Sequence, residues 1–408
     1  MREGRRLPRP YRSRAANALV VALAVLAVAT AAGLIALWPR GDAIPAPPGV
    51  GSLRTESARV TVVNAEGCRS AVAGDPAATP GVQGCRRVTV RLTSGPDEGD
   101  AAGFDIGGPV DIDVGDRVRV AATGVPADAT VGGVTADRYA FSDFERRSTL
   151  LWLTIAFAVI VIATSRWRGA RALAGLAVSL GVVLLFVVPA ILEGASPLGV
   201  ATVGALAIML VTIPLAHGTG PKAVAAALGT ACALLLTVVL ARLATSLAHI
   251  TGFSSEEATF LSATTTDLSI QGLLLAGIVI GALGVLDDLT VSQASVVMAL
   301  RRADPSAGGR HLFREALSVG HDHIAATVNT LVLAYVGASL PVLLVFSVAG
   351  TSTSDAVNSE VVASEIVATL VGSIGLIAAV PITTGIAALL ATRVETERLG
   401  DAAHGHTH

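Results

Sequence analysis

Two adjacent aspartates, Asp287 and Asp288, end a long apolar segment of this 408-residue chain. A charged side chain at the centre of a bilayer costs about 3 kcal/mol on insertion scales, so an acid in such a segment is a candidate functional site. Polar side chains continue beyond the two acids at Thr290 and Gln293. Carboxyl groups buried between helices carry protons in pumps and transporters. The pattern therefore predicts an ion or proton relay in this segment.

A second polar cluster opens the next apolar segment. It consists of His321, Asp322, His323, Asn329 and Thr330. Residues seven apart share a helix face, so Asp322 lies with Asn329 and His323 lies with Thr330. Because histidine titrates near neutral pH, a histidine and an aspartate between helices could pass protons to the first cluster. A zinc site is the rival interpretation, but His321 and His323 point about 200° apart on a helix, so we assign no metal. The plain alternative is that both clusters cap their helices at the membrane surface.

Three glycines precede the first cluster on the same helix face. Gly277, Gly281 and Gly284 lead to Asp288 at spacings of four, three and four residues, which keeps all four on one side of a helix. Small residues at this spacing let a second helix backbone approach closely. We therefore expect this face to pack against another part of the protein.

The composition indicates an integral membrane protein. The chain is 52% hydrophobic and 15% charged, whereas soluble domains carry about 25% charged residues. A net charge of −2 gives no reason to expect nucleic-acid binding. The segment His217-Gly-Thr-Gly-Pro-Lys222 lacks the full phosphate-loop frame, and neither a nucleophile elbow nor a His-Glu-x-x-His motif occurs. We expect no enzymatic activity and no cofactor.

Eight apolar segments are long enough to cross the roughly 30 Å hydrocarbon core as helices. They are residues 15–37, 148–165, 172–192, 198–216, 223–241, 268–286, 324–348 and 366–391. The sequence therefore predicts a mainly α fold, a polytopic helical membrane bundle of about eight spans. Its first span is longer than the apolar core of a signal peptide and precedes Trp38-Pro39-Arg40, which is no cleavage site, so we expect a retained anchor.

Arginines cluster in every second connection, and the positive-inside rule then assigns both termini to the cytoplasm. We expect five parts along the chain. These are a basic cytoplasmic leader (1–14), a first transmembrane helix (15–37), a β-rich extracytoplasmic domain (38–147), a seven-helix membrane domain (148–391) and a cytoplasmic tail (392–408).

Three segments of the extracytoplasmic part alternate polar and β-branched residues, which is typical of half-buried strands. They are residues 59–63, 86–92 and 116–121. A small antiparallel barrel or sandwich fits, with an OB-like barrel as one option, and its role is either to bind a partner or to cap the membrane domain. Cys68 and Cys85 lie in this oxidising location, so a disulfide is favoured over two free thiols. Cys232 lies in an apolar segment, where we expect a small core residue.

Several long stretches resemble the YibE/F family of bacterial membrane proteins. Among them are Gly281-Ala-Leu-Gly-Val-Leu-Asp-Asp-Leu-Thr-Val-Ser-Gln-Ala-Ser295, His321-Asp-His-Ile-Ala-Ala-Thr-Val-Asn-Thr-Leu-Val-Leu-Ala-Tyr335 and Glu365-Ile-Val-Ala-Thr-Leu-Val-Gly-Ser-Ile-Gly375. The resemblance implies a multi-pass protein of the bacterial cytoplasmic membrane and no defined activity.

The last three predicted spans are also similar to those of the export subunit SecF and the wider RND transporters. In that comparison Asp287, Asp288 and Thr290 match the intramembrane acid region, and Asn329 and Thr330 match the polar span after it. The chain departs from SecF in having two more spans and a small β-rich domain.

These features favour a permease or export accessory for an unknown solute or exported substrate in the lipid bilayer, with proton coupling as one option. A non-transporting scaffold whose β domain binds a partner is the first alternative. The second is an intramembrane hydrolase, because Gly284-Val-Leu-Asp287 is loosely similar to the Gly-x-Gly-Asp motif of intramembrane aspartyl proteases. Leu286 replaces the second glycine of that motif, which weakens this alternative.

Overall fold

The computed structural model describes residues 14–41, 55–64, 86–107, 110–124, 130–131, 134–135, 137–264 and 268–393. The chain divides into two compact units. Met1–Ile44 and Val161–His408 form a helical unit, and Pro45–Ile160 form a unit built around a β-sheet.

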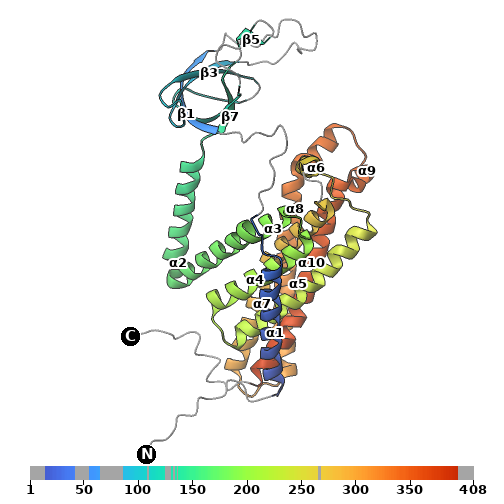
Figure 1. Ribbon diagram of the computed structural model, residues 1–408. Coiled ribbons are helices and arrows are strands. Elements are labelled where there is room, and N and C mark those ends of the chain that lie inside the picture. Colours follow the sequence, from blue (N-terminus) through green and yellow to red (C-terminus); the bar gives the residue numbers. More distant parts are fainter. Residues whose placement is uncertain are drawn as a thin grey trace, which may run out of the picture. The chain divides into compact units, whose positions relative to one another are not determined.

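From the second helix onward the helices follow one another along the chain, whereas all the described strands lie between the first and second helices (Figure 1). The helices are α1 (Arg14–Ala36), α2 (Arg147–Val182), the π-helical turn η1 (Val183–Val187), α3 (Val188–Leu192), α4 (Pro197–His217), α5 (Pro221–Leu247), α6 (Glu256–Thr264), α7 (Ile270–Ala303), α8 (Gly309–Val348), α9 (Thr353–Asn358) and α10 (Glu360–Ala391). Proline opens both α4 and α5, where its missing N–H is not needed by the helix. The long helices contain apolar stretches of at least 18 residues, which is typical of membrane spans.

Seven helices in the described residues are long and apolar enough to cross a membrane. This count takes α2, η1 and α3 as one run of 46 residues, Arg147–Leu192. Arg166 interrupts the run with φ 51° and ψ −131°, a backbone conformation that no α-helix contains. The arms on either side contain the two predicted spans 148–165 and 172–192. The prediction of a mainly α, polytopic membrane bundle is confirmed.

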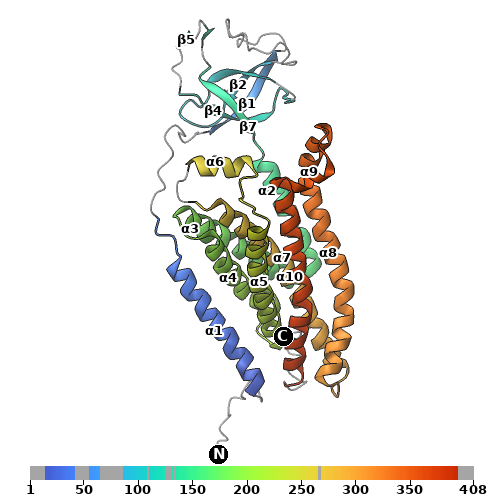
Figure 2. The same cartoon turned by 90° about the vertical axis from the view of Figure 1, so that its right-hand side faces the viewer.

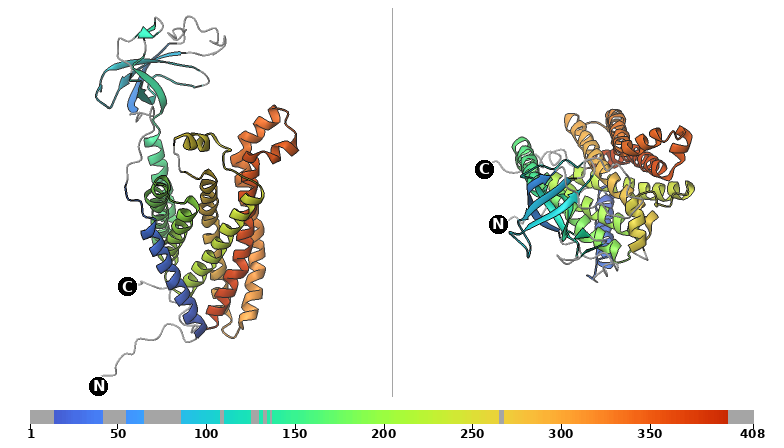
Figure 3. Two further views of the ribbon diagram at one scale, coloured as in Figure 1. Left: turned by 45° about the vertical axis from the view of Figure 1, so that its right-hand side comes forward. Right: turned by 90° about the horizontal axis from the view of Figure 1, so that it is seen from above.

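Three helices form the centre of the bundle. α5, α7 and α10 each contact the other two, α4 packs beside α7, and α8 runs along α10 (Figures 2 and 3). The buried side chains of α5 are mostly small, and Ala225, Ala226 and Ala233 are fully buried. Small residues allow helix backbones to approach closely in a membrane, where van der Waals packing replaces the hydrophobic effect as the main attraction.

The tightest glycine contacts between helices of this core occur outside the glycine series of α7 that was expected to pack closely. A Cβ added to Gly229 of α5 would overlap the side chain of Thr383 in α10. A Cβ added to Gly375 of α10 would likewise overlap Thr237 in α5. The contact between α5 and α10 therefore requires glycine, which has no Cβ atom, at both positions.

The glycine face of α7 differs from the expected close helix contact. A Cβ at Gly277 or Gly284 would have nothing within 4 Å, and one at Gly281 would lie 3.6 Å from the Tyr335 hydroxyl. All three glycines are exposed in this chain. The described part of α8 leaves this face open because α8 packs mainly against α10. Cys232 also differs from expectation, since it is exposed on the outside of α5.

Two acids tie loops to helix ends. Glu360 at the start of α10 accepts hydrogen bonds from the backbone N–H groups of Thr251 and Gly252, at 2.9 and 2.5 Å. Glu193, just after α3, accepts from the backbone of Arg40 and Gly41 at 2.7 and 2.8 Å. These bonds fix the connections around the helical core.

The second unit contains a five-stranded antiparallel sheet with the order β3-β2-β1-β4-β7. Its strands are β1 (Thr55–Asn64), β2 (Arg86–Leu92), β3 (Ala101–Ile106), β4 (Arg117–Ala122) and β7 (Tyr139–Phe144), and β5 (Thr130–Val131) and β6 (Val134–Thr135) form a separate hairpin. The outer strands β3 and β7 approach each other, so the sheet curls into a partly open barrel, the architecture that OB folds share. The predicted β-rich domain is confirmed, and its three predicted strands fall within β1, β2 and β4 or at their edges.

The barrel encloses an apolar core with polar ties between strands. Val60, Val88 and Phe104 are almost fully buried inside it. The two terminal guanidinium nitrogens of Arg87 donate to the two carboxylate oxygens of Asp137, at 2.6 and 2.5 Å. One of these nitrogens also donates to Asp105, at 2.9 Å. The hydrogen bonds to Asp137 raise the pKa of Arg87 further above its usual value. Cys68 and Cys85 lie outside the described residues, so their predicted disulfide stays a prediction.

Candidate functional site

The two aspartates lie within a continuous helix. α7 spans 34 residues, from a start capped by the Ser269 side chain to Ala303. The predicted span 268–286 is therefore only the first half of this helix, and both acids fall near its middle. Adjacent helix residues point about 100° apart. Asp287 and Asp288 consequently face different surroundings.

Asp287 faces α4. Its Oδ2 atom accepts a long hydrogen bond, 3.5 Å, from the Thr212 hydroxyl. Its Oδ1 atom is buried and has no hydrogen-bond partner among the described residues. A buried carboxylate without full pairing costs several kcal/mol. Binding a proton or a cation would remove that cost.

Asp288 faces α8. It lines a cavity of about 260 Å³ together with Gly284 and Ser292 of α7 and with His323 and Thr327 of α8. Gly284 leaves space in this wall because it has no side chain. Of the two polar clusters expected from the sequence, the structure thus brings together Asp288 and His323. An acid and an imidazole around one small cavity can exchange a proton directly or through water.

The remaining polar residues of α8 lie elsewhere. His321, Asp322, Asn329 and Thr330 are exposed, as Asp288 and His323 are, but they do not line the cavity beside Asp288. The Thr330 hydroxyl donates to the Ala326 carbonyl of its own helix at 3.0 Å. Asp322 and Asn329 share one face of α8, as predicted, but that face does not line the cavity beside Asp288. His323 and Thr327 are the residues of α8 that line it.

Thr290 and Gln293 are fully buried on the opposite side of α7 from the cavity. The hydroxyls of Thr290 and Thr230 are 2.6 Å apart. Gln293 Nε2 donates to the Ala316 carbonyl at 2.7 Å and to the Thr384 hydroxyl at 2.8 Å. These contacts join α7 to α5, α8 and α10, so the two residues act first as links between helices.

Sequence reasoning did not identify the partners of these residues. Thr212, Thr230 and Thr384 each lie inside an apolar segment, where a hydroxyl needs an acceptor. A hydroxyl in an apolar segment therefore predicts a polar contact, but the sequence does not tell which neighbouring helix provides the partner.

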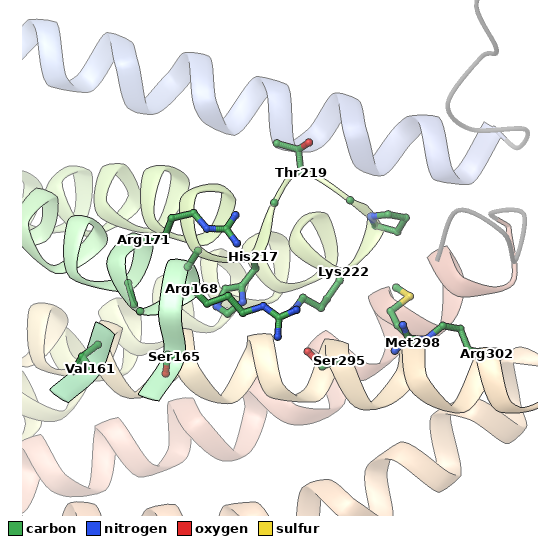
Figure 4. A pocket seen from close by; sticks show the side chains of 16 residues that line it. Val161, Ser165, Arg168, Arg171, His217, Thr219, Lys222, Ser295, Met298 and Arg302 are labelled. Atoms are coloured by element: carbon green, nitrogen blue, oxygen red, sulfur yellow. The ribbon is translucent and has the colours of Figure 1, made fainter. Parts of the chain in front are cut away.

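A second and larger cavity opens on the same face of α7. We call it the basic cavity: about 850 Å³, it is lined by Arg168 and Arg171 of α2, His217 and Lys222 at the α4–α5 connection, and Arg302 of α7 (Figure 4). Ser292 lines the smaller cavity, and Ser295, three residues later, lines the basic cavity. His217 also interacts electrostatically with Asp288. One polar strip of α7 therefore connects the acid site to the basic cavity.

Metal binding was tested against the positions of possible ligands. No group of three or more His, Cys, Asp or Glu side chains that could hold an ion occurs in the described part of the chain.

Comparison with known proteins gives one match. The model of the YibE/F-like protein family matches residues 153–393. This range contains α3 to α10, most of α2 and all residues of both cavities. No match was found among curated proteins or among solved structures.

Proposed function

The chain belongs to the YibE/F-like family, and we propose that its membrane domain is a permease or export accessory in which Asp287, Asp288 and His323 carry protons. It is a multi-pass membrane protein. The observation that carries the proposal is that Asp288 and His323 line one cavity beside the middle of a long membrane helix.

The chemistry rests on the two different environments of the acids. Asp287 has one weak hydrogen bond and one unpartnered buried oxygen, so its ionised form is costly between helices. A proton passed from His323 to Asp288, and from there to Asp287, would remove charge from the contact between α7 and α4. Without this buried charge, α7 and α4 could shift relative to each other. Such a shift would open the site alternately to each side of the membrane.

The proposed orientation has both termini in the cytoplasm of a bacterial cell. Support comes from the basic cavity, because Arg168, Arg171, Lys222 and Arg302 collect at one set of helix ends, and positive residues favour the cytoplasmic side. The β-barrel unit then lies outside the cytoplasm, where it would receive an exported substrate or a partner protein.

A scaffold is the second candidate, and the buried polar contacts of α7 favour it. The bonds from Thr290 to Thr230 and from Gln293 to Thr384 hold helices together without any need for transport. Such contacts contribute about 0.6 kcal/mol each in membrane proteins. A scaffold has no flux to lose, so a flux measurement separates the two candidates.

We propose no enzymatic activity. An aspartyl hydrolase needs two carboxyl groups that share one proton, whereas Asp287 and Asp288 point to different helices. Absence of cleavage of a labelled single-span substrate by the reconstituted protein would agree with this proposal, and cleavage that Asp287→Asn abolishes would refute it.

Proton flux into liposomes tests the main proposal. The reconstituted chain is given an imposed pH gradient, an internal pH-sensitive dye and a small-molecule extract of the cells that produce it. We expect Asp287→Asn, Asp288→Asn and His323→Gln to slow the flux at least about tenfold, since each removes a group that carries the proton. Glu315→Gln is the matched control, because Glu315 is an exposed acid of α8 that lines neither cavity in the described residues. Wild-type flux in both Asn variants would end the proposal.

A further inference from the structure

We propose that the basic cavity binds a multivalent, phosphate-bearing anion. This inference goes beyond the proposed function, because binding of the anion requires no proton transfer and no transport.

The lining of the basic cavity carries an excess of positive charge. Its lining contains three arginines, one lysine and one histidine, and it contains no acidic residue. In the described part of the chain none of these five side chains has a salt bridge or a side-chain hydrogen bond, whereas Arg87 and Arg119 of the β-barrel unit are paired. Lys222 is repelled by both Arg168 and Arg302. A bound anion would replace this repulsion with attraction.

The donors surround one space. Figure 4 shows Arg168, Arg171, His217 and Lys222 converging from α2 and from the α4–α5 connection, with Ser295 of α7 beside them. Arginine forks match the oxygen geometry of a phosphate group, and lysine adds a compact charge. Arg171 Nε is buried and has no partner among the described residues, so it is a donor without an acceptor.

The backbone adds a second contribution. α5 begins at Pro221, its N-cap is Gly220, and no side chain caps it. The free N–H groups and the dipole at the start of a long helix favour an anion. Gly218 has φ +78°, and a Cβ at Gly218 or Gly220 would meet nothing within 4 Å, so the connection leaves the helix start open. The sequence here lacks the phosphate-loop frame, but α2 and α7 supply the charges that such a loop would need.

Size and charge indicate the class of ligand. A volume of about 850 Å³ lies within the roughly 300–1,000 Å³ of small-molecule sites. Three arginines and one lysine would be poorly neutralised by a monovalent ion, whereas a diphosphate or a phosphodiester headgroup offers several charged oxygens. The cavity is formed at helix ends, so both a soluble phosphate compound and an anionic lipid headgroup are possible sources.

The first arm of the test uses inorganic pyrophosphate. The full chain is placed in nanodiscs of phosphatidylcholine alone and titrated by calorimetry, at constant ionic strength set with sodium chloride. We expect binding in the wild type and at least about tenfold weaker binding in the double variant Arg168→Gln/Lys222→Gln, since it removes two positive charges and their hydrogen bonds to the anion. Arg310→Gln/Arg314→Gln removes the same charge from exposed positions of α8 outside the cavity, and it should bind like the wild type.

The second arm distinguishes the two sources. Nanodiscs that also contain diphosphatidylglycerol are analysed by native mass spectrometry for retained lipid. Pyrophosphate binding that the lipid does not weaken identifies a soluble phosphate compound. The ligand is a lipid headgroup if the wild type retains the lipid, if this lipid displaces pyrophosphate, and if the cavity variant does not retain it.

The single variant Arg302→Gln keeps the test decisive if the double variant does not fold. Arg302 lines the cavity, so the Arg302→Gln variant should bind pyrophosphate several-fold more weakly. Because Arg302 is exposed, the substitution should leave the melting temperature of the protein unchanged. Equal binding of pyrophosphate and lipid by the wild type and the cavity variants, or no binding by the wild type, would overturn the inference. Neither result depends on proton flux, so this inference and the proposed function can fail separately.

Discussion

The Thr212 hydroxyl of α4 lies 3.5 Å from Asp287 Oδ2 of α7, and it is the hydrogen-bond partner of this carboxyl group. The second oxygen, Oδ1, is buried without a partner in the described residues. A single weak contact therefore holds an acid between two membrane helices. This arrangement suits a group whose charge changes during function, since a strongly bonded carboxylate would resist protonation.

Replacing Thr212 with valine removes this contact while keeping the shape of the side chain. We expect the Thr212→Val variant to fold and to lose up to about tenfold in proton flux, because the contact is long and a hydrogen bond to a charged group is worth about 1.5–3 kcal/mol. Thr202→Val is the control, since the Thr202 hydroxyl bonds only to the Leu198 carbonyl of its own helix at 2.7 Å. Equal flux in the two variants would show that Thr212 does not support Asp287.

Asp288 and Asp322 should differ in importance although only Asp322 is adjacent to His321 and His323 in the sequence. The side chains of Asp288, His323 and Asp322 are all exposed, but the first two line one cavity, whereas Asp322 lines neither that cavity nor the basic cavity. We expect at least about a tenfold loss of flux for Asp288→Asn and less than about twofold for Asp322→Asn, since only Asp288 lines the cavity through which His323 could pass a proton, directly or through water.

Coupling within the same cavity sharpens this expectation. If Asp288 and His323 act on one proton, the double variant Asp288→Asn/His323→Gln should be no slower than the slower single variant, because residues that act as a unit are non-additive. A severe loss in Asp322→Asn, or simple multiplication of the two single effects, would contradict the assignment.

Gly229→Ala should destabilise the bundle. Its new Cβ would overlap Thr383 across the contact between α5 and α10, and overpacking of this kind costs about 1–3 kcal/mol. Unfolding of the full chain in mixed micelles measures the change. Adding Thr383→Ala should recover most of the loss, since it removes the overlapping atoms. Gly277→Ala is the matched control, because nothing lies within 4 Å of its added Cβ. Equal effects of the two alanine substitutions would refute this account of the packing.

Tyr139 of β7 gives a pH-dependent test of the β-barrel unit. Its hydroxyl donates to Asp97 at 2.5 Å and contacts Glu56 at 3.2 Å. Burial, and then the hydrogen bond to Asp97, raise the pKa of Tyr139 above its ordinary value of 10.0. A raised pKa means that the folded state holds the proton more tightly, so its stabilising contribution is complete below pH 10 and is lost as pH rises through the raised value.

An alkaline absorbance titration measures this shift in the full chain. The difference between the wild type and Tyr139→Phe isolates one phenol from the three tyrosines of the sequence. We expect the Tyr139 transition to lie above pH 10 and to coincide with unfolding of the barrel. Tyr139→Phe should also destabilise the unit by about 1–3 kcal/mol at neutral pH. A transition at the ordinary tyrosine value would contradict the buried, bonded phenol.

The sequence predicts the membrane helices and three strands because both depend on local patterns. Polar residues continue after Asp288 without a turn signal, and α7 indeed continues to Ala303. β3 escaped prediction because it starts with Ala101, Ala102 and Gly103, which carry no β-branched signal.

Packing between distant helices could not be predicted in the same way. The spacing of Gly277 and Gly281 fits a known motif, yet the close contacts occur at Gly229 and Gly375. Small residues lie at the same spacing from these two glycines, so the motif does not tell which helix faces pack closely. The basic cavity draws residues from α2, the α4–α5 connection and α7. Only the tertiary arrangement shows that His323, and not the neighbouring Asp322, shares a cavity with Asp288.

Infrared difference spectroscopy of the reconstituted full chain across a pH jump tests the central claim most directly. The claim is that the acids of α7 take up and release protons inside the membrane domain. We predict a carboxylic-acid C=O band that appears on acidification, that loses intensity in Asp287→Asn and in Asp288→Asn, and that is unchanged in Glu315→Gln. A band that keeps its full intensity in both Asn variants would contradict the account.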